Sequence, residues 1–321
     1  MKSIGGYFEL EIRRGVHYHE NAIRLCTARN CFEYILLARQ YLKVYIPRYT
    51  CSVMLEPLKK NKIEYEFYSL DTFLNPVFEK KIDKKEAFLY TNYFGLKQQT
   101  VIDLANNIHN LIIDNAQAFF ASPVKGIDTF YSARKFFGVP DGAYLYTNVF
   151  LLENFPVFNP LNSCRYLLGR MTNTAEEYFS AFQKSESFFV DLPIHKMSVI
   201  SERILSSLDY PSIAYKRQFN YNLMYYSLNK FNVFHFDISD FCSSVPMVYP
   251  FFTDNNLLRE QLLLKHIYVP QYWPNVQNWS SESEFEFKLS QCLIPLPIDQ
   301  RYGAEEMNFI SKEIMNNIKR I

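Results

Sequence analysis

Strand-like and helix-like segments alternate over residues 22–150, and this alternation constrains the fold more than any other feature of the chain. Short apolar stretches rich in β-branched and aromatic residues are separated by segments whose apolar residues recur at helical spacing. The strand-like stretches are 22–27, 43–47, 63–70, 86–94, 111–121, 127–132 and 142–148, and the helix-like ones are 28–40, 51–61 and 100–110. The alternation predicts an α/β fold in which helices cover both faces of a mainly parallel sheet.

The second half of the chain has a different pattern. Helical spacing predominates after residue 165, and short strand-like stretches precede a last helix. The predicted helices are 173–184, 197–209, 215–231 and 304–321. We therefore predict a large α/β domain over residues 1–205 and a smaller α+β domain over residues 206–321. A chain of 321 residues is long enough to form two such domains.

The composition excludes several classes of protein. Apolar residues make up 48% of the chain and charged residues 21%, which is typical of a soluble globular protein rather than a disordered one. The net charge is +1 and no dense basic stripe is present, so nucleic acid is not an expected partner. Because no stretch resembles a membrane span or a secretion signal, we expect a cytoplasmic protein without a membrane partner.

Neither the cysteines nor the histidines indicate a metal site. The 6 cysteines are scattered without a CxxC pair, which predicts reduced thiols rather than a disulfide framework or a zinc site. Only His17 and His19 are closely spaced, and a single close pair is weak evidence for a metal. No metal is therefore expected.

Polar residues follow the predicted strands at the points where a parallel sheet would bind a ligand. Asp114 ends the apolar stretch LIIDN, and a carboxylate there is unfavourable unless it is paired. Gln117 follows 3 residues later, Ser132 and Lys135 follow the next strand, and Thr27 starts the turn before the first helix. Since the carboxyl ends of parallel strands meet at one edge of the sheet, we expect these side chains to lie close together.

Each of these residues also has an ordinary structural explanation. Asp114 could cap a turn, Gln117 could be a solvated loop residue, and Ser132 could be the N-cap of a helix. Residues 27–30 could be any helix start, because they lack a glycine signature. Taken singly, the structural explanation is the more common one for each of them.

Together, however, these residues match the requirements of pyridoxal phosphate. That cofactor needs a lysine for a Schiff base, an acid beside its pyridine nitrogen and a phosphate site, which free amides at a helix start favour. Lys135 lies between an aromatic strand and the pair Phe136 and Phe137. We expect these aromatic residues to take water away from the Lys135 amine, so that it can act as nucleophile and base.

The same motifs resemble those of the DegT/StrS-type family of nucleotide-sugar aminotransferases, which have the aspartate-aminotransferase fold. IIDNAQA is similar to the family's strand ending in Glu-Asp-x-Ala-Gln, and YSARKFFGVPDGA to its Ser…Lys motif with a following glycine turn. RLCTARNCFEYIL resembles the family's phosphate-binding turn. The likeness extends through KVYIPRYTCSVMLEPL, LYTNYFGLKQ, MSVISERIL and LIPLPIDQRYGAEEMNFI over most of the chain.

The resemblance assigns roles to particular residues. It implies that Lys135 carries the Schiff base and moves the proton, that Asp114 holds the pyridine nitrogen, and that Gln117 positions the cofactor ring. The residues implied for the phosphate are Thr27, Ala28, Arg29 and Ser132. The family's reaction would be amino transfer, from glutamate, to a keto sugar on a nucleotide, for surface polysaccharide or a secondary metabolite. A homodimer with shared active sites is also implied.

The sequence departs from the family pattern at several of these positions. Ala28 stands in place of a glycine and Arg29 in place of a small hydroxyl residue. Cys51 occupies the position of a ring-stacking aromatic, which leaves Tyr49 or Tyr93 as candidates to stack on the cofactor. The spacing from Ser132 to Lys135 is shorter than in the family, and LPIHKMS lacks an asparagine that reaches the partner subunit.

Two other functions stay open. One is a sugar dehydratase, although some dehydrating relatives carry histidine in place of the lysine, so Lys135 favours transfer. The other is a degenerate binding module, which the altered phosphate turn favours and the intact Asp114, Gln117 and Lys135 oppose. The candidates for contact with a pyrophosphate or a donor carboxylate are Arg165, Arg170, Arg217 and Arg301, for which surface ion pairing is the ordinary alternative.

Overall fold

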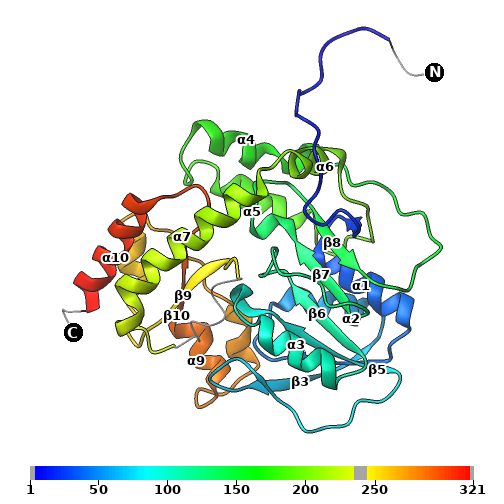
Figure 1. The fold of residues 1–321 in the computed structure, drawn as a ribbon, viewed down its shortest axis with the longest axis horizontal. Helices are drawn as coiled ribbons and strands as arrows, with labels where there is room; N and C mark the ends of the chain where they lie inside the picture. Colours follow the sequence, from blue (N-terminus) through cyan, green and yellow to red (C-terminus); the bar gives the residue numbers. More distant parts are fainter. Residues whose placement is uncertain (1–3, 235–243, 319–321) are drawn as a thin grey trace.

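A computed structural model describes residues 4–234 and 244–318 of the chain. An eight-stranded sheet lies at its centre, in the order β1-β8-β7-β6-β5-β2-β3-β4 (Figure 1). The strands are β1 Ile23–Leu25, β2 Lys43–Pro47, β3 Glu64–Leu70, β4 Pro76–Val77, β5 Glu86–Thr91, β6 Leu111–Asn115, β7 Asp128–Ser132 and β8 Ala143–Tyr146. Strands β3, β2, β5, β6 and β7 pair in parallel, and β4, β8 and β1 are antiparallel at the edges. The predicted mainly parallel sheet is confirmed.

The helices follow the predicted segments with local differences. They are α1 Ala28–Arg39, α2 Glu56–Lys60, α3 Gln98–Asn107, α4 Arg165–Thr172, α5 Phe179–Ser187, α6 Val199–Ser206, α7 Tyr210–Leu228, α8 Leu258–Leu263, α9 Phe285–Cys292 and α10 Ala304–Ile318. The segment predicted as one helix over 51–61 is a 3-10 turn, Ser52–Leu55, followed by α2. Helices α4, α8 and α9 were not predicted, and the helix predicted over 173–184 begins later, at Phe179. The predicted strand over 111–121 ends at Asn115, and the turns after it carry Gln117.

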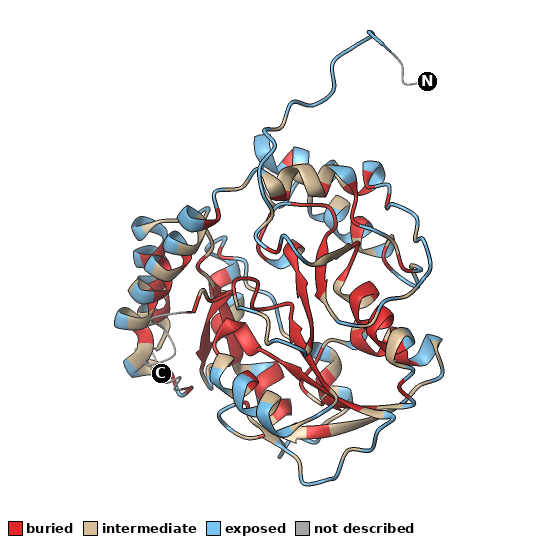
Figure 2. Cartoon of the chain, turned by 45° about the vertical axis from the view of Figure 1, so that its right-hand side comes forward, coloured by how far each residue is buried: buried red, intermediate tan, exposed pale blue. Residues whose placement is uncertain are grey.

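Burial on both faces explains why strand β6 is so apolar. Helices cover both sides of the sheet, and the central strands are buried along their length (Figure 2). Every residue of β6 is buried, with Ile112 and Ile113 on opposite faces of the strand. Within β6 a polar side chain is therefore surrounded by apolar residues, and the end of the strand is where it can reach a polar partner.

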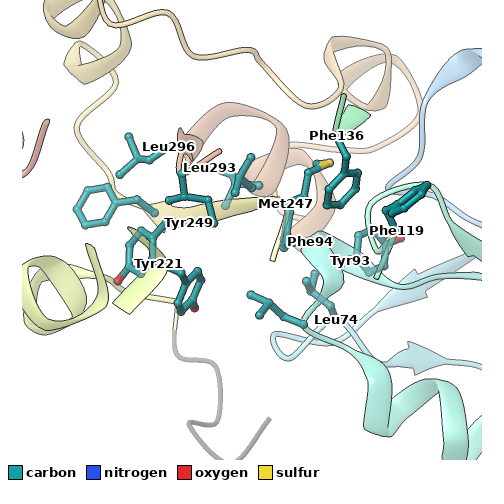
Figure 3. Close-up of a cluster of buried hydrophobic side chains, with 14 of the residues drawn as sticks. Leu74, Tyr93, Phe94, Phe119, Phe136, Tyr221, Met247, Tyr249, Leu293 and Leu296 are labelled. Carbon is teal, nitrogen blue, oxygen red and sulfur yellow. The ribbon is translucent and has the colours of Figure 1, made fainter. Parts of the chain in front are cut away.

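The C-terminal part of the chain adds a second, small sheet. Strand β9, Val248–Phe252, pairs antiparallel with β10, Leu293–Pro297, and helix α7 packs against β9 and against α10. One buried apolar cluster joins both parts of the chain, because Phe94, Phe119 and Phe136 lie in it with Met247 and Tyr249 (Figure 3). The domain boundary at residue 205 stays a prediction.

The described residues also bear on membrane spans, metal ions and disulfides. No helix among the described residues is long and apolar enough to cross a membrane. Within residues 4–234 and 244–318, no group of 3 or more His, Cys, Asp or Glu side chains is arranged to hold a metal ion. The cysteines Cys26, Cys31, Cys51, Cys164 and Cys292 are free thiols, and Cys242 lies outside the described residues.

Candidate active site

Three neighbouring parallel strands bring the predicted polar residues to one edge of the sheet. Thr91 of β5 pairs in register with Asp114 of β6, and Asn115 of β6 with Tyr131 of β7. Ser132, the last residue of β7, is therefore one strand away from the end of β6. The carboxyl ends of parallel strands are the usual place for a ligand in such a sheet.

Asp114 is a buried carboxylate with only part of its hydrogen-bonding capacity used. Asp114 is 5% exposed, and its Oδ1 accepts a hydrogen bond from the Ala116 amide at 2.8 Å. Oδ2 is contacted by the Thr91 hydroxyl at 3.5 Å, the outer limit of a hydrogen bond. Burial raises the pKa of Asp114, and the positive charge of Lys135 and the Ala116 amide oppose that rise. Oδ2 is thus left with acceptor capacity in a buried setting.

Gln117 has a buried donor without an acceptor. The residue is 1% exposed, and its Oε1 accepts a hydrogen bond from the Phe94 amide at 2.8 Å. Its Nε2 has no hydrogen-bond partner among the described residues. An unsatisfied buried amide is costly and uncommon, so this nitrogen is a candidate contact for a bound molecule.

Lys135 is exposed, and the prediction that its amine loses water is wrong for the described chain. It ends a single 3-10 turn, Ala133–Lys135, in which the amides of Phe136 and Phe137 donate to the Ala133 carbonyl at 3.0 and 2.9 Å. The turn buries Ala133 and the two phenylalanines but leaves Lys135 facing solvent. Its charge nevertheless lowers the pKa of Asp114, which places the two predicted catalytic residues in the same region, although no ion pair joins them among the described residues.

The start of helix α1 lies beside this turn. Thr27 is the N-cap, and its Oγ1 accepts a hydrogen bond from the Asn30 amide at 3.1 Å. The next two amides, of Ala28 and Arg29, have no acceptor within the helix because of their position. The Gly142 amide donates to the Cys26 carbonyl at 2.7 Å, and the Ala133 amide donates to the Gly142 carbonyl at 3.0 Å. One glycine therefore ties the start of α1 to the end of β7.

Glycine is favoured at position 142 because of its backbone conformation. Its φ is +126°, where a side chain would be strained. A Cβ atom there would lie 3.3 Å from Leu205 and 3.5 Å from the Cβ of Ala133. The positive φ therefore favours glycine at position 142, while a Cβ atom would meet the lysine turn at an ordinary contact distance.

The other predicted phosphate residues are placed as follows. Ser132 is 8% exposed and makes no capping hydrogen bond to the turn that it precedes. The guanidinium of Arg29 pairs with Glu56, Nη1 to Oε2, at 2.5 Å. The side chain of Arg29 is thus engaged by helix α2, and only its amide remains for a phosphate at the helix start.

Tyr49 and Tyr93, the candidates for ring stacking, are both fully buried. The Tyr93 hydroxyl donates to the Tyr49 carbonyl at 2.8 Å, and the Tyr49 hydroxyl donates to the Tyr272 carbonyl at 2.9 Å. These bonds hold both rings in the core between the two parts of the chain. The assignment of Tyr93 to the cofactor stays a prediction.

Asp141 is a second buried carboxylate, to which the sequence assigned no role. It accepts hydrogen bonds from the Ser198 amide at 2.7 Å and from the hydroxyls of Ser198 and Ser201, each at 2.5 Å. Burial raises the pKa of Asp141, and these hydrogen bonds oppose the rise. Asp141 therefore fastens the glycine turn to the start of α6, and the serine N-cap at position 198 was the signal that could have suggested it.

Arg217 and Gln300 were also missed as neighbours of the lysine turn. Both donate hydrogen bonds to the Phe136 carbonyl, Arg217 through Nη2 at 3.2 Å and Gln300 through Nε2 at 2.8 Å. Arg217 is 1% exposed, so surface ion pairing, the ordinary alternative, is wrong for this residue, and its contact with a pyrophosphate or a donor carboxylate stays a prediction. Arg301, another candidate, pairs with Asp299 at 2.7 Å.

Surface hollows do not mark the same place. One is lined by residues of the N-terminal segment and α6, including Arg14 and Arg203, and another by residues of α4 and α5, including Arg165 and Lys184. Neither is lined by Asp114, Gln117 or Lys135. The site is defined instead by its buried polar atoms and by the open amine beside them.

No family model matches the sequence, and no curated protein matches it either. Solved structures with the same fold are numerous. A DegT DnrJ EryC1 StrS aminotransferase from Brucella abortus superposes with a TM-score of 0.60 at 14% identity, over 92% of this chain and 85% of that one. A sugar aminotransferase candidate from Streptococcus pneumoniae, in its PLP form, gives 0.63 at 13% identity, over 91% and 85%. The E. coli GDP-4-keto-6-deoxy-D-mannose-3-dehydratase with bound hydrated PLP gives 0.62 at 13%, over 91% and 87%. The predicted aminotransferase fold is confirmed.

Proposed function

We propose that this protein is a pyridoxal-phosphate-dependent aminotransferase that transfers an amino group, from glutamate, to a keto sugar carried on a nucleotide. The observation that carries the proposal is the position of Lys135 relative to Asp114: a buried carboxylate with an unfilled oxygen lies within the field of an accessible amine. This pair lies on a fold that sugar aminotransferases share. The unpartnered Gln117 nitrogen adds a third polar group to the same strand end.

The residues present fit pyridoxal phosphate. Asp114 would hold the protonated pyridine nitrogen at Oδ2, and Gln117 would donate from Nε2 to an oxygen of the ring. The amides of Ala28 and Arg29 at the start of α1, with the hydroxyls of Thr27 and Ser132, would hold the phosphate. Each of these groups is a buried or helix-terminal atom that still has hydrogen-bonding capacity in the described chain.

The side chains would divide the chemistry between them. When bound, the cofactor accepts the electron pair that is released as the Cα–H bond of the amino donor breaks. Asp114 would keep a proton on the ring nitrogen, and because it is buried, its attraction to that cation is weakly screened. The Lys135 amine would take the proton from Cα of the donor and deliver it to the reactive carbon of the cofactor.

A nucleotide-linked sugar and a homodimer are part of the proposal. One neighbour in fold is named for a GDP-linked keto sugar and one as a sugar aminotransferase, which supports a nucleotide sugar as substrate class. In the single chain the Lys135 amine faces solvent, so a second subunit is the natural source of a surface that would cover it. We propose a cytoplasmic homodimer for this reason.

A dehydratase is the second candidate, because one neighbour in fold is a GDP-sugar dehydratase. The reactive amine at position 135 favours transfer. A binding module without catalysis is the third, and the pairing of Arg29 with Glu56 supports it, since that arginine is not free for a phosphate. Titration with cofactor and donor separates the three.

The test is a titration of the protein with pyridoxal phosphate, followed by visible absorption. Wild type and the exposed-lysine control Lys125→Ala should gain a visible band that Lys135→Ala lacks, and added glutamate should remove it. A band that glutamate leaves unchanged would contradict transfer from this donor and favour the dehydratase. No band at saturating cofactor would overturn the enzyme proposal and leave the binding module.

A further inference from the structure

The carbonyl of Phe136, the residue directly after Lys135, is held from a distant part of the chain. It accepts hydrogen bonds from Arg217 Nη2 at 3.2 Å and from Gln300 Nε2 at 2.8 Å. The Arg217 guanidinium also lies over the Phe136 ring, 4.6 Å from its centre. Two side chains that are separated by more than 80 residues from Phe136 thus meet at one backbone oxygen.

Arg217 is locked in this position by further bonds. Its Nε donates to Gln300 Oε1 at 3.0 Å, and its Nη1 donates to the Met247 carbonyl at 3.1 Å. Burial lowers the pKa of Arg217 to about 10, while the nearby Asp299 opposes this. The carboxylate of Asp299 is itself bonded to Arg301, so the direct partners of the buried guanidinium are neutral oxygens. A buried cation with neutral partners is an expensive way to stabilise a fold.

Gln300 is fixed by the same helix. Asn220 of α7 donates to the carbonyls of Ile298, Asp299 and Tyr302 at 3.2, 3.3 and 3.0 Å. These bonds anchor the loop that carries Gln300 to the helix that carries Arg217. The two donors therefore act on Phe136 as one rigid unit.

The lysine turn needs such an external hold. It is a single 3-10 turn, and Lys135 is exposed, so packing of its own side chain does not fix its direction. A reactive group must be held within a fraction of an ångström of its productive position. Side chains from outside the turn bind the backbone next to Lys135 at the Phe136 carbonyl. Among the described residues, no backbone group closer in sequence to Lys135 accepts such a bond.

We propose that Arg217 and Gln300 are positioning residues that hold the Phe136 carbonyl and thereby aim the Lys135 amine at Asp114. We call this pair the Phe136 clamp. The proposal rests on the proposed function only in taking Lys135 as the reactive amine. It predicts that the C-terminal part of the chain controls the geometry of a residue in the large sheet without touching the substrate.

Amide hydrogen exchange of the protein without cofactor tests the clamp. Arg217→Met and Gln300→Leu remove one donor each, and Arg259→Met is the matched control, because Arg259 donates to the Leu293 carbonyl at 2.8 Å and not to Phe136. We expect about tenfold faster exchange over residues 133–139 in both clamp variants, with β9 and β10 unchanged, and no change over 133–139 in the control. Equal acceleration throughout the molecule, or none over 133–139, would overturn the proposal.

The reactivity of Lys135 is a second measurement. It should stay unchanged if Arg217 and Gln300 only stabilise the fold. The rate of acylation of Lys135 by a small activated ester is measured against pH by peptide mass spectrometry, relative to Lys125. Gln300→Leu should change the rate of acylation of Lys135 across the pH range and leave that of Lys125 unchanged, because the turn no longer holds the Lys135 amine in one position. An unchanged profile would contradict the clamp.

Both measurements are made without cofactor, so they separate the clamp from the proposed function. If pyridoxal phosphate does not bind, the exchange and acylation results stand by themselves. If it does bind, the clamp variants of the holoenzyme should lose about tenfold in kcat with KM changed by less than about twofold. A rise in KM with kcat unchanged would contradict a positioning role.

Discussion

The carboxylates Asp114 and Asp141, at the edge of the sheet, are both buried but have different hydrogen-bond partners. Burial raises the pKa of both. Asp141 accepts three hydrogen bonds, each of 2.7 Å or less, from a backbone amide and two serine hydroxyls. Asp114 accepts one firm hydrogen bond, from Ala116, and a marginal one from Thr91. A satisfied acid fastens the fold, whereas an acid with an unfilled oxygen is placed for a ligand.

The same short turn supplies a cation to each carboxylate. Arg134 lowers the pKa of Asp141 and Lys135 that of Asp114, each against the larger effect of burial. Arg134 pairs with Glu186 and lies over the Phe189 ring at 4.4 Å, so it is fixed. Lys135 is exposed. The structural acid therefore has a fixed cation, and the candidate catalytic acid has an accessible one.

The largest predicted effect separates the two acids by activity. Asp114→Asn should lower kcat/KM about a thousandfold, because an amide cannot hold the proton on the cofactor nitrogen. The same variant without cofactor should unfold no more easily than wild type at neutral pH, because a buried charge has been removed. Steady-state kinetics and denaturant unfolding of the same preparation measure both quantities.

The pH dependence of unfolding sharpens this result. Since the pKa of Asp114 is raised in the folded state, the folded protein binds more protons than the unfolded chain just above the ordinary aspartate pKa. The contribution of Asp114 to stability therefore falls as pH rises through that window, and Asp114→Asn should lack this fall. An Asn variant that is less stable than wild type at neutral pH would contradict the account of Asp114.

Asp141 should give the opposite result. Asp141→Ala removes three hydrogen bonds and leaves the hydroxyls of Ser198 and Ser201 buried, so the free energy of unfolding should fall by about 3 to 4 kcal/mol. Ser201→Ala, which removes one of the bonds, should cost about 1 kcal/mol. Denaturant melts of the two variants measure the difference, and an Asp141→Ala protein as stable as wild type would break the comparison.

A third buried group tests whether burial acts in the same way on a base. His19 donates from Nε2 to the Phe119 carbonyl at 2.7 Å, and burial lowers its pKa to about 4. The folded state then binds fewer protons than the unfolded chain between the ordinary histidine pKa and about 4, so stability is lost as pH falls through that window. In His19→Phe the free energy of unfolding should fall by about 2 kcal/mol less than in wild type over this pH window. In the exposed control His109→Phe it should fall as much as in wild type. An identical slope in the His19 variant would contradict the predicted direction.

The smallest effect is expected at Gln117. Gln117→Leu removes the unpartnered Nε2 together with the acceptor of the Phe94 amide. The affinity for pyridoxal phosphate should fall about tenfold, and stability without cofactor should change little, because a lost bond is offset by removal of an unsatisfied donor. Fluorescence titration with the cofactor measures the affinity, and an unchanged affinity would remove Gln117 from the site.

The residues whose places in the fold the sequence predicted correctly share one property: each is identified by its local context. Asp114 ends an apolar strand, and Thr27 precedes a helical pattern, so strand-end and N-cap reasoning placed both. The two donors to the Phe136 carbonyl and the partners of Asp141 could not be found in this way, because 57 to 164 residues separate the groups that meet. The exposure of Lys135 was mispredicted for a related reason. Its neighbours in sequence are aromatic, but a single 3-10 turn sends their side chains into the core and the lysine out.

The most direct test of the central claim is chemical trapping at Lys135. The protein is incubated with pyridoxal phosphate, reduced with borohydride, digested and analysed by peptide mass spectrometry. We predict that a cofactor-derived group is found on Lys135 in wild type and in Asp141→Ala at a temperature where that variant is folded. Modification only of other lysines such as Lys125, or none at saturating cofactor, would contradict the account.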